Sequence, residues 1–251
     1  GAIEAVASTG GQLMPPVMGA AAFLMSDMTG ISYYEIARAA LLPAILYYIV
    51  LFSVVHLEAL KRNIPIIDTK DIPSIWETLK YGGHLLLSLP VFIYMMFNGY
   101  SVMYASIWSL MMAVALSYFR RSTWLTPKKI LRTIENGVGA VIPVATACAC
   151  AGIIIGIITL TGLGLKFSSL VISLSGGNIF LALVLTMISS LILGMGLPTA
   201  AAYILVATLA APALEQLGIN QLAAHLFVFY SAMLSSITPP VALAAYAASG
   251  L

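Results

Sequence analysis

Two short polar stretches of the sequence, one near each end, carry residue types that could bind a monovalent cation. Each stretch leads into the same tripeptide, Pro-Pro-Val, inside an apolar segment. Hydroxyl, amide and backbone carbonyl oxygens are neutral ligands, which suit an ion that has to be released again. The candidate Na⁺ ligands are Ser8, Thr9, Gly11 and Gln12 in the first stretch, and Ser235, Ser236, Ile237 and Thr238 in the second.

The double prolines, Pro15-Pro16 and Pro239-Pro240, should interrupt the helices in which they lie. Proline has no amide donor, and it disfavours helix in the residue before it. The carbonyls before such a break lose their intrahelical partners, and in a bilayer only protein groups or a water-filled cavity can satisfy them. We therefore expect two broken helices whose freed carbonyls could bind Na⁺. A simple kink at the prolines is the alternative.

A third candidate region lies between two short apolar runs, residues 179–193 and 199–214. At ~1.5 Å per residue the runs would be roughly 22–24 Å long, which is shorter than the ~30 Å hydrocarbon core of a bilayer. We expect a re-entrant hairpin that enters the membrane and returns, with two tilted spans and a tight turn as the alternative. The tip residues that could close over an ion, or shape the turn, are Gly194, Gly196, Pro198 and Thr199.

The composition places these motifs in a membrane. Apolar residues make up 61% of the 251 residues and charged residues only 8%, whereas a soluble domain has about 25% charged residues. The net charge is +2 and no basic run resembles a nucleic-acid footprint, so no nucleic-acid partner is expected. No nucleophile–base pair appears at membrane depth, which argues against an intramembrane enzyme. His225 could be a protonation site, or a hydrogen-bonded packing histidine.

Four further segments, residues 39–57, 83–97, 101–119 and 138–160, are apolar enough to be transmembrane helices. The two loops that flank the middle pair hold nine of the eleven Lys and Arg residues, so the positive-inside rule assigns both loops to the cytoplasm. If the hairpin does not cross the membrane, the two Pro-Pro-Val segments run in opposite directions. That arrangement is an inverted repeat, the architecture of many secondary transporters.

Three motifs also resemble a known family, the large membrane subunit of TRAP (tripartite ATP-independent periplasmic) transporters. They are ASTGGQLMPPVMGAA at residues 7–21, GMGLPTAAAY at 194–203 and SSITPPVALAAY at 235–246. The phrasing is similar to the fused-permease branch that works with TAXI-type binding proteins. The resemblance implies Na⁺-driven import of a small organic anion, such as a carboxylate, by an elevator-type motion in the bacterial inner membrane. It also implies a periplasmic binding protein and a small membrane subunit or its fused equivalent as partners, and no cofactor besides the coupling ion.

The expected fold is accordingly an all-α polytopic membrane protein, a fragment of an inverted-repeat elevator-type transporter. Residues 1–58 would end the first repeat, residues 59–136 would form cytoplasmic loops and a helical hairpin, and residues 137–251 would form the second repeat. The first re-entrant hairpin of the family would precede Gly1, so we expect the chain to be a piece of a longer protein. An ion-conducting channel built on the same hairpin is the alternative function.

Overall fold

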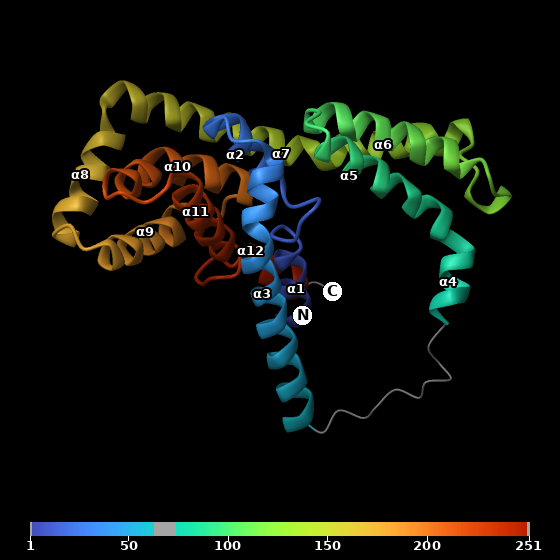
Figure 1. The fold of residues 1–251 in the computed structure, drawn as a ribbon, viewed down its shortest axis with the longest axis horizontal. Coiled ribbons are helices and arrows are strands. Elements are labelled where there is room, and N and C mark those ends of the chain that lie inside the picture. Colours follow the sequence, from blue (N-terminus) through green and yellow to red (C-terminus); the bar gives the residue numbers. More distant parts are fainter. Residues whose placement is uncertain (1, 63–73, 250–251) are drawn as a thin grey trace. The chain divides into compact units, whose positions relative to one another are not determined.

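The computed structural model describes residues 2–62 and 74–249, which form helices and no strand (Figure 1). The chain divides into two compact units. The larger unit comprises Gly1–Phe52 and Ala140–Leu251, and the smaller unit comprises Ser53–Gly139. Each unit is described by itself. Lys70, which contributes to the predicted cytoplasmic charge, lies outside the described residues.

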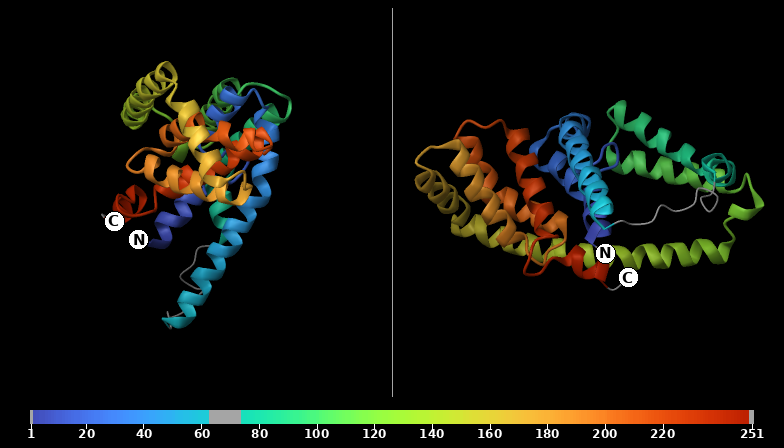
Figure 2. Two further views of the ribbon diagram at one scale, coloured as in Figure 1. Left: turned by 90° about the vertical axis from the view of Figure 1, so that its left-hand side faces the viewer. Right: turned by 90° about the horizontal axis from the view of Figure 1, so that it is seen from below.

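The core of the larger unit is a bundle of four helices: α8 (Leu163–Ser175), α9 (Ile179–Gly194), α10 (Thr199–Gln216) and α11 (Gln221–Ser235). Helix α10 packs against the other three and also against α2 (Ala20–Thr29) (Figures 1 and 2). Most of its residues are buried, and alanine is the commonest among them. The second arm of the predicted hairpin is therefore the central helix of this unit.

Small residues allow the bundle helices to approach one another closely. The buried residues of α9 recur at every fourth position, which places them in one row along the helix. A buried hydroxyl also joins two helices, because Ser168 Oγ of α8 donates to the Leu209 carbonyl of α10 at 3.1 Å. The row on α9 consists of Ala182, Thr186, Ser190 and Gly194.

Both double prolines interrupt helices, so that prediction is confirmed and a simple kink is excluded. Helix α1 (Ala2–Gly10) ends before Pro15-Pro16, and α2 begins after it. Helix α11 ends at Ser235, and α12 (Leu243–Ser249) begins after Pro239-Pro240. The residues between the helices form turns.

In the described part of the chain, two helices are long and apolar enough to cross a bilayer, α3 (Tyr33–Lys61) and α7 (Pro127–Thr161). They contain the predicted spans 39–57 and 138–160. Residues 161–178, which lie outside the predicted spans, include α8. The serines of this segment do not prevent the helix, because Ser169, Ser173 and Ser175 each donate to a carbonyl three or four residues earlier.

The smaller unit contains a helical hairpin. Helices α5 (Ser88–Phe97) and α6 (Val102–Ser117) pack against each other, and the chain turns at Gly99 with φ +79°. The predicted span 83–97 starts with a 3-10 turn, η2 (Gly83–Leu87), and α4 (Ile75–Gly82) precedes it. The chain thus turns tightly between the predicted spans 83–97 and 101–119.

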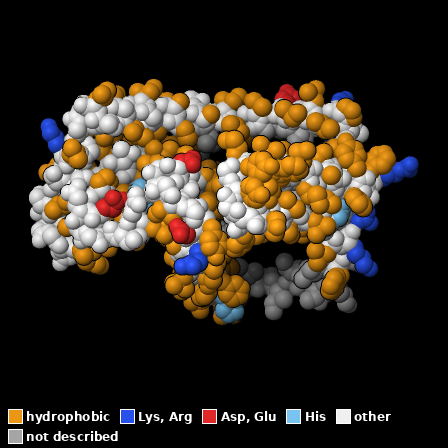
Figure 3. Space-filling model, turned by 45° about the horizontal axis from the view of Figure 1, so that its top comes forward, with side chains coloured by type: hydrophobic (Ala, Val, Ile, Leu, Met, Phe, Trp, Pro, Cys, Tyr) orange, Lys and Arg blue, Asp and Glu red, His pale blue; other side chains and the backbone are white. Residues whose placement is uncertain are grey.

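Large apolar side chains cover much of the surface that Figure 3 shows. Leu160 of α7 is 89% exposed and Phe180 of α9 is 75% exposed. Water would disfavour so much exposed apolar area, whereas lipid tails are an equally apolar environment. The exposed face therefore agrees with the membrane setting that the composition predicts.

Tyrosines of α3 hold the first broken segment in place. Tyr33 is buried, and its hydroxyl lies 3.0 Å from the Pro16 carbonyl oxygen and 2.7 Å from that of Val17, to which it donates. Tyr47 similarly donates to the Val6 carbonyl at 2.9 Å. These hydroxyls supply donors to carbonyls at and near the helix break.

We expect Tyr33→Phe to destabilise the larger unit, because it leaves the Pro16 and Val17 carbonyls without this donor. An unsatisfied buried polar group costs about 1–3 kcal/mol. The midpoint of thermal unfolding of the purified protein in detergent should fall. Tyr94→Phe, on a side chain that is 68% exposed, is the control and should leave the midpoint unchanged. Equal midpoints for both variants would contradict the role given to Tyr33.

Candidate ion-binding site

The two broken segments follow the same backbone path. In the first, the Met18 amide donates to the Met14 carbonyl at 3.2 Å, and in the second the Ala242 amide donates to the Thr238 carbonyl at 3.2 Å. Met18 and Ala242 both have positive φ, +50° and +43°. Both Pro-Pro peptide bonds are cis. The repeat that the sequence motif suggests is therefore present in the backbone.

The halves of the two segments contact each other reciprocally. Helix α1, the first half of one segment, packs against α12, the second half of the other. Helix α2 in turn packs against α11. Two segments that lie side by side in opposite directions make this pairing, because the start of each then meets the end of the other. Helices α1 and α12, the first and the last of the described residues, therefore lie side by side (Figures 1 and 2).

The hairpin tip lies against the second break. A methyl group added at Gly194, the last residue of α9, would overlap Ser235 Oγ and would lie 2.9 Å from Ser235 Cβ. On the far side of the double proline, Val241 lies 3.9 Å from the Cβ position of Gly196. Gly196 has φ +75°, which glycine adopts readily, and this turn leads through Pro198 into α10. The structure thus brings the tip candidates to the second polar stretch.

The hydroxyls at the second break all donate to carbonyls of their own helix. Ser235 Oγ donates to Ala232 at 2.6 Å, Ser236 Oγ to Met233 at 2.7 Å and Thr238 Oγ1 to Leu234 at 2.7 Å. A hydroxyl whose proton is engaged in this way presents only lone pairs to its other neighbours. Each of the three oxygens is therefore an acceptor, the role that a cation ligand needs.

The break frees fewer carbonyls than we expected. Backbone amides donate to the carbonyls of Ser235 (from Thr238, 3.4 Å), Ser236 (from Ala244, 2.9 Å) and Thr238 (from Ala242, 3.2 Å). The turns replace lost helical bonds with local ones, which sequence reasoning from proline alone does not predict. Among the hydrogen bonds of the described residues, none reaches the Ile237 carbonyl, which lies between these satisfied groups. Ile237 is therefore the backbone candidate that the geometry favours.

The first break offers a different environment. Ser8 Oγ is exposed and lies 3.3 Å from Glu4 Oε1, while Thr9 Oγ1 donates to the Ala5 carbonyl at 2.7 Å. Gln12 packs beside Gly19, whose amide closes the turn on the Gln12 carbonyl at 2.9 Å. The hairpin tip contacts the second break, at Ser235. At the first break, the Tyr33 hydroxyl forms a hydrogen bond with a backbone carbonyl instead. The two groups of candidate ligands therefore have different neighbours.

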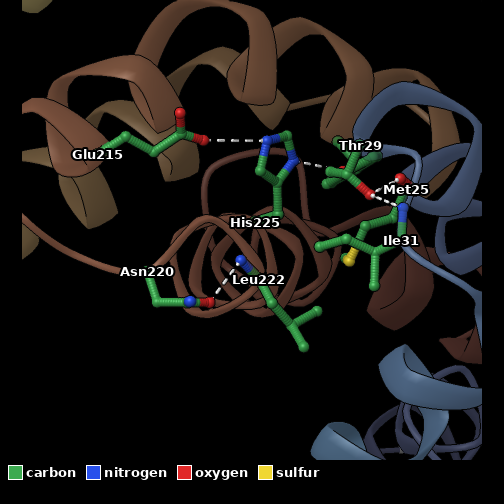
Figure 4. A network of polar contacts seen from close by, with 8 residues as sticks. Met25, Thr29, Ile31, Glu215, Asn220, Leu222 and His225 are labelled. Atoms are coloured by element: carbon green, nitrogen blue, oxygen red, sulfur yellow. Dashed lines mark hydrogen bonds and ion pairs between the residues drawn. The ribbon is translucent and has the colours of Figure 1, made fainter.

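A polar network links α10 and α11 at the buried His225 (Figure 4). His225 of α11 lies 2.8 Å from the Tyr203 hydroxyl of α10 and 3.5 Å from a carboxylate oxygen of Glu215. This geometry agrees with the hydrogen-bonded packing histidine that we considered for His225. Glu215 is its second partner. No pattern in the sequence predicts these contacts, because His225 lies on α11 whereas Tyr203 and Glu215 lie on α10.

The comparison with protein families decides the identity. The family model of the tripartite ATP-independent periplasmic transporter, DctM component, matches residues 1–251. The chain belongs to this family. Comparisons with curated proteins and with solved structures give no match.

The DctM component is the large permease of a TRAP transporter, so the predicted resemblance to TRAP permeases is confirmed. The chain is part of a multi-pass membrane transporter and not an enzyme. TRAP permeases perform secondary transport together with a periplasmic binding protein and a further membrane subunit. The alternative of a passive channel is therefore wrong.

We expect Gly194→Ala to disturb the packing of the TRAP hairpin tip on the second break, because the added methyl overlaps the Ser235 side chain. Overpacking of this kind costs about 1–3 kcal/mol. Thermal unfolding should shift to lower temperature and transport should decrease.

Gly152→Ala is the matched control, since Gly152 is also helical but has open space at its Cβ position. It should leave both measurements unchanged, or raise stability slightly because alanine favours helix. If both variants behaved alike, the close contact between Gly194 and Ser235 would be refuted.

Proposed function

We propose that this chain is the part of a TRAP permease that binds a coupling Na⁺ ion between its hairpin tip and its second broken helix. The ion would drive the import of a small organic anion, such as a carboxylate, which a TAXI-type binding protein delivers at the outer face of the bacterial inner membrane. The small membrane subunit, or a fused equivalent, would complete the transporter. An elevator-type motion would carry the site across the membrane.

The observation that carries this proposal is the contact between Gly194 and Ser235. It brings a helix end, a glycine turn and a broken helix to one place, where the local oxygens are neutral acceptors. Oxygen ligands suit a hard cation, and the lack of a carboxylate among the candidates favours a monovalent over a divalent ion. The proposed ligands are the Ser235 and Thr238 hydroxyls and the Ile237 carbonyl, with the tip residues closing over them.

Helix length supports the re-entrant form of the hairpin. Helices α9 and α10 have 16 and 18 residues, so each is roughly 24–27 Å long and shorter than the ~30 Å core. Their tip touches a break that lies between two helices of one apolar segment. A hairpin that enters the membrane and turns at that depth explains this contact, while a complete crossing would carry the tip to the opposite surface.

The reciprocal packing of the broken segments supports the inverted-repeat form of the fold. Secondary transporters with inverted repeats bind substrate and ions near the bilayer midplane, where discontinuous helices meet. Such a repeat would pair helix α1 with α12 and helix α2 with α11, and these helices do pack together. The proposed ion site then lies where the elements of the second repeat converge.

In the complete transporter, we expect the double variant Ser235→Ala/Thr238→Ala to raise the half-saturating Na⁺ concentration for uptake severalfold. The two substitutions remove two neutral ligands, and a combined loss of ~1 kcal/mol of binding free energy corresponds to a roughly fivefold change. Uptake into proteoliposomes at varied Na⁺ measures the effect. The concentration of binding protein needed for half-maximal uptake should change much less.

Ser231→Ala is the matched control for this experiment. Ser231 is also buried in α11, and its hydroxyl also donates to a carbonyl of its own helix, that of Phe227 at 2.8 Å, but it lies one turn before the break. Its removal should leave the Na⁺ dependence unchanged. If the double variant folds and keeps the normal Na⁺ dependence, the hydroxyls only cap the helix and the proposed site is wrong.

The re-entrant hairpin predicts which side of the membrane its flanking residues face. Leu174→Cys, at the end of α8, and Gln216→Cys, at the end of α10, should react with a membrane-impermeant thiol reagent from the same side. Both side chains are exposed. Labelling from opposite sides would show that the hairpin contains a complete crossing.

A further inference from the structure

The smaller unit carries a group of cations that the proposed transport site does not use. Between residues 78 and 134 the sequence contains six Lys and Arg residues and no Asp or Glu. Helices α5 and α6 form an antiparallel hairpin, so the residues before α5 and those after α6 return to the same end. We call this end the basic corner; its residues are Lys80, Arg120, Arg121, Trp124, Lys128, Lys129 and Arg132.

Contacts on Trp124 fix part of the basic corner. The indole Nε1 donates to the Tyr118 carbonyl at 2.9 Å, which anchors the ring on the end of α6. The Arg121 guanidinium lies 5.9 Å from the ring centroid, within the range of a cation–π contact. Lys129 Nζ donates to the Trp124 carbonyl at 3.3 Å. Two cations are thus held around one aromatic residue.

Further bonds attach this loop to the segment before α5. Arg120 donates to the Lys80 carbonyl, so the two basic stretches meet. His84 Nε2 lies 3.3 Å from Thr123 Oγ1, and Thr123 in turn donates to the Ser117 carbonyl at 2.8 Å. The loop is therefore a structured element rather than a set of independent side chains.

The charged side chains of the basic corner are exposed on the surface of the smaller unit. All six Lys and Arg residues are exposed, and Figure 3 shows Lys and Arg side chains beside hydrophobic ones at the right-hand end of the view. Phe119, next to Arg120, is 85% exposed and Trp124 is 45% exposed. Cations beside exposed aromatic rings match the boundary between headgroups and acyl chains, where aromatic residues and Lys or Arg anchor membrane proteins.

We propose that the basic corner binds the headgroups of anionic phospholipids in the leaflet that surrounds the transporter. Charge complementarity supports this partner, because a leaflet with anionic lipids attracts each nearby Lys or Arg by an amount equivalent to roughly fivefold in affinity. The exposed rings would insert beside the headgroups. Bound lipid would then hold the α5–α6 hairpin at the membrane surface.

The experiment uses the complete transporter in nanodiscs that contain equal amounts of phosphatidylglycerol and phosphatidylcholine. Native mass spectrometry after release measures the ratio of the two lipids that stay bound. The wild type should retain phosphatidylglycerol in at least fivefold excess. The triple variant Arg121→Gln/Lys128→Gln/Lys129→Gln should lower that ratio towards one, while Arg121→Lys/Lys128→Arg/Lys129→Arg should preserve it.

Two controls test the location and the source of the anion. Lys166→Gln, on an exposed residue of α8 in the larger unit, should leave the ratio unchanged. Inorganic phosphate at millimolar concentration should not displace the bound lipid, because the acyl chains contribute to its binding.

Several outcomes would overturn the proposal. One is a ratio near one for the wild type, and another is an unchanged ratio in the folded Gln variant. Displacement by free phosphate would identify a site for a soluble anion instead. Loss of transport in the Gln variant with an unchanged lipid ratio would indicate that the corner serves an acidic protein partner.

Discussion

Hydrocarbon offers no hydrogen bonds, and this constraint governs how the larger unit is built. Every helix break at membrane depth exposes carbonyls that must find partners within the protein. Local turns supply some of them, as the bonds from Met18 and Ala242 show. Tyr33 supplies another at the first break. The same need explains why the buried serines of α11 donate to their own helix and leave few donors unused.

Close packing is the second consequence of the membrane setting. Helices in lipid gain little from burying apolar area against each other, so small residues that permit near contact become important. The alanines of α10 and the row of small residues on α9 provide that contact. Gly194 ends this row, which is why the hairpin tip can reach the Ser235 side chain. Packing and site geometry thus depend on the same residues.

The sequence was sufficient for the features that local chemistry determines. Double prolines predicted both helix breaks, and the motifs predicted the TRAP family. It could not predict contacts between distant segments, such as α1 with α12 or Tyr33 with the first break, because no periodic pattern encodes them. It also overestimated the number of freed carbonyls, since turn bonds depend on backbone angles that residue types alone do not fix.

The two copies of the broken segment share a backbone but differ in their neighbours, and that difference bears on function. Tyr33 donates to carbonyls at the first break, and such a donor competes with any cation for the same lone pairs. At the second break three hydroxyls present lone pairs, and the Ile237 carbonyl, like the Leu13 carbonyl at the first break, receives no bond from the described residues. A repeated backbone can therefore hold two chemically distinct sites. Within this chain, the contact with the hairpin tip is what distinguishes the second break from the first.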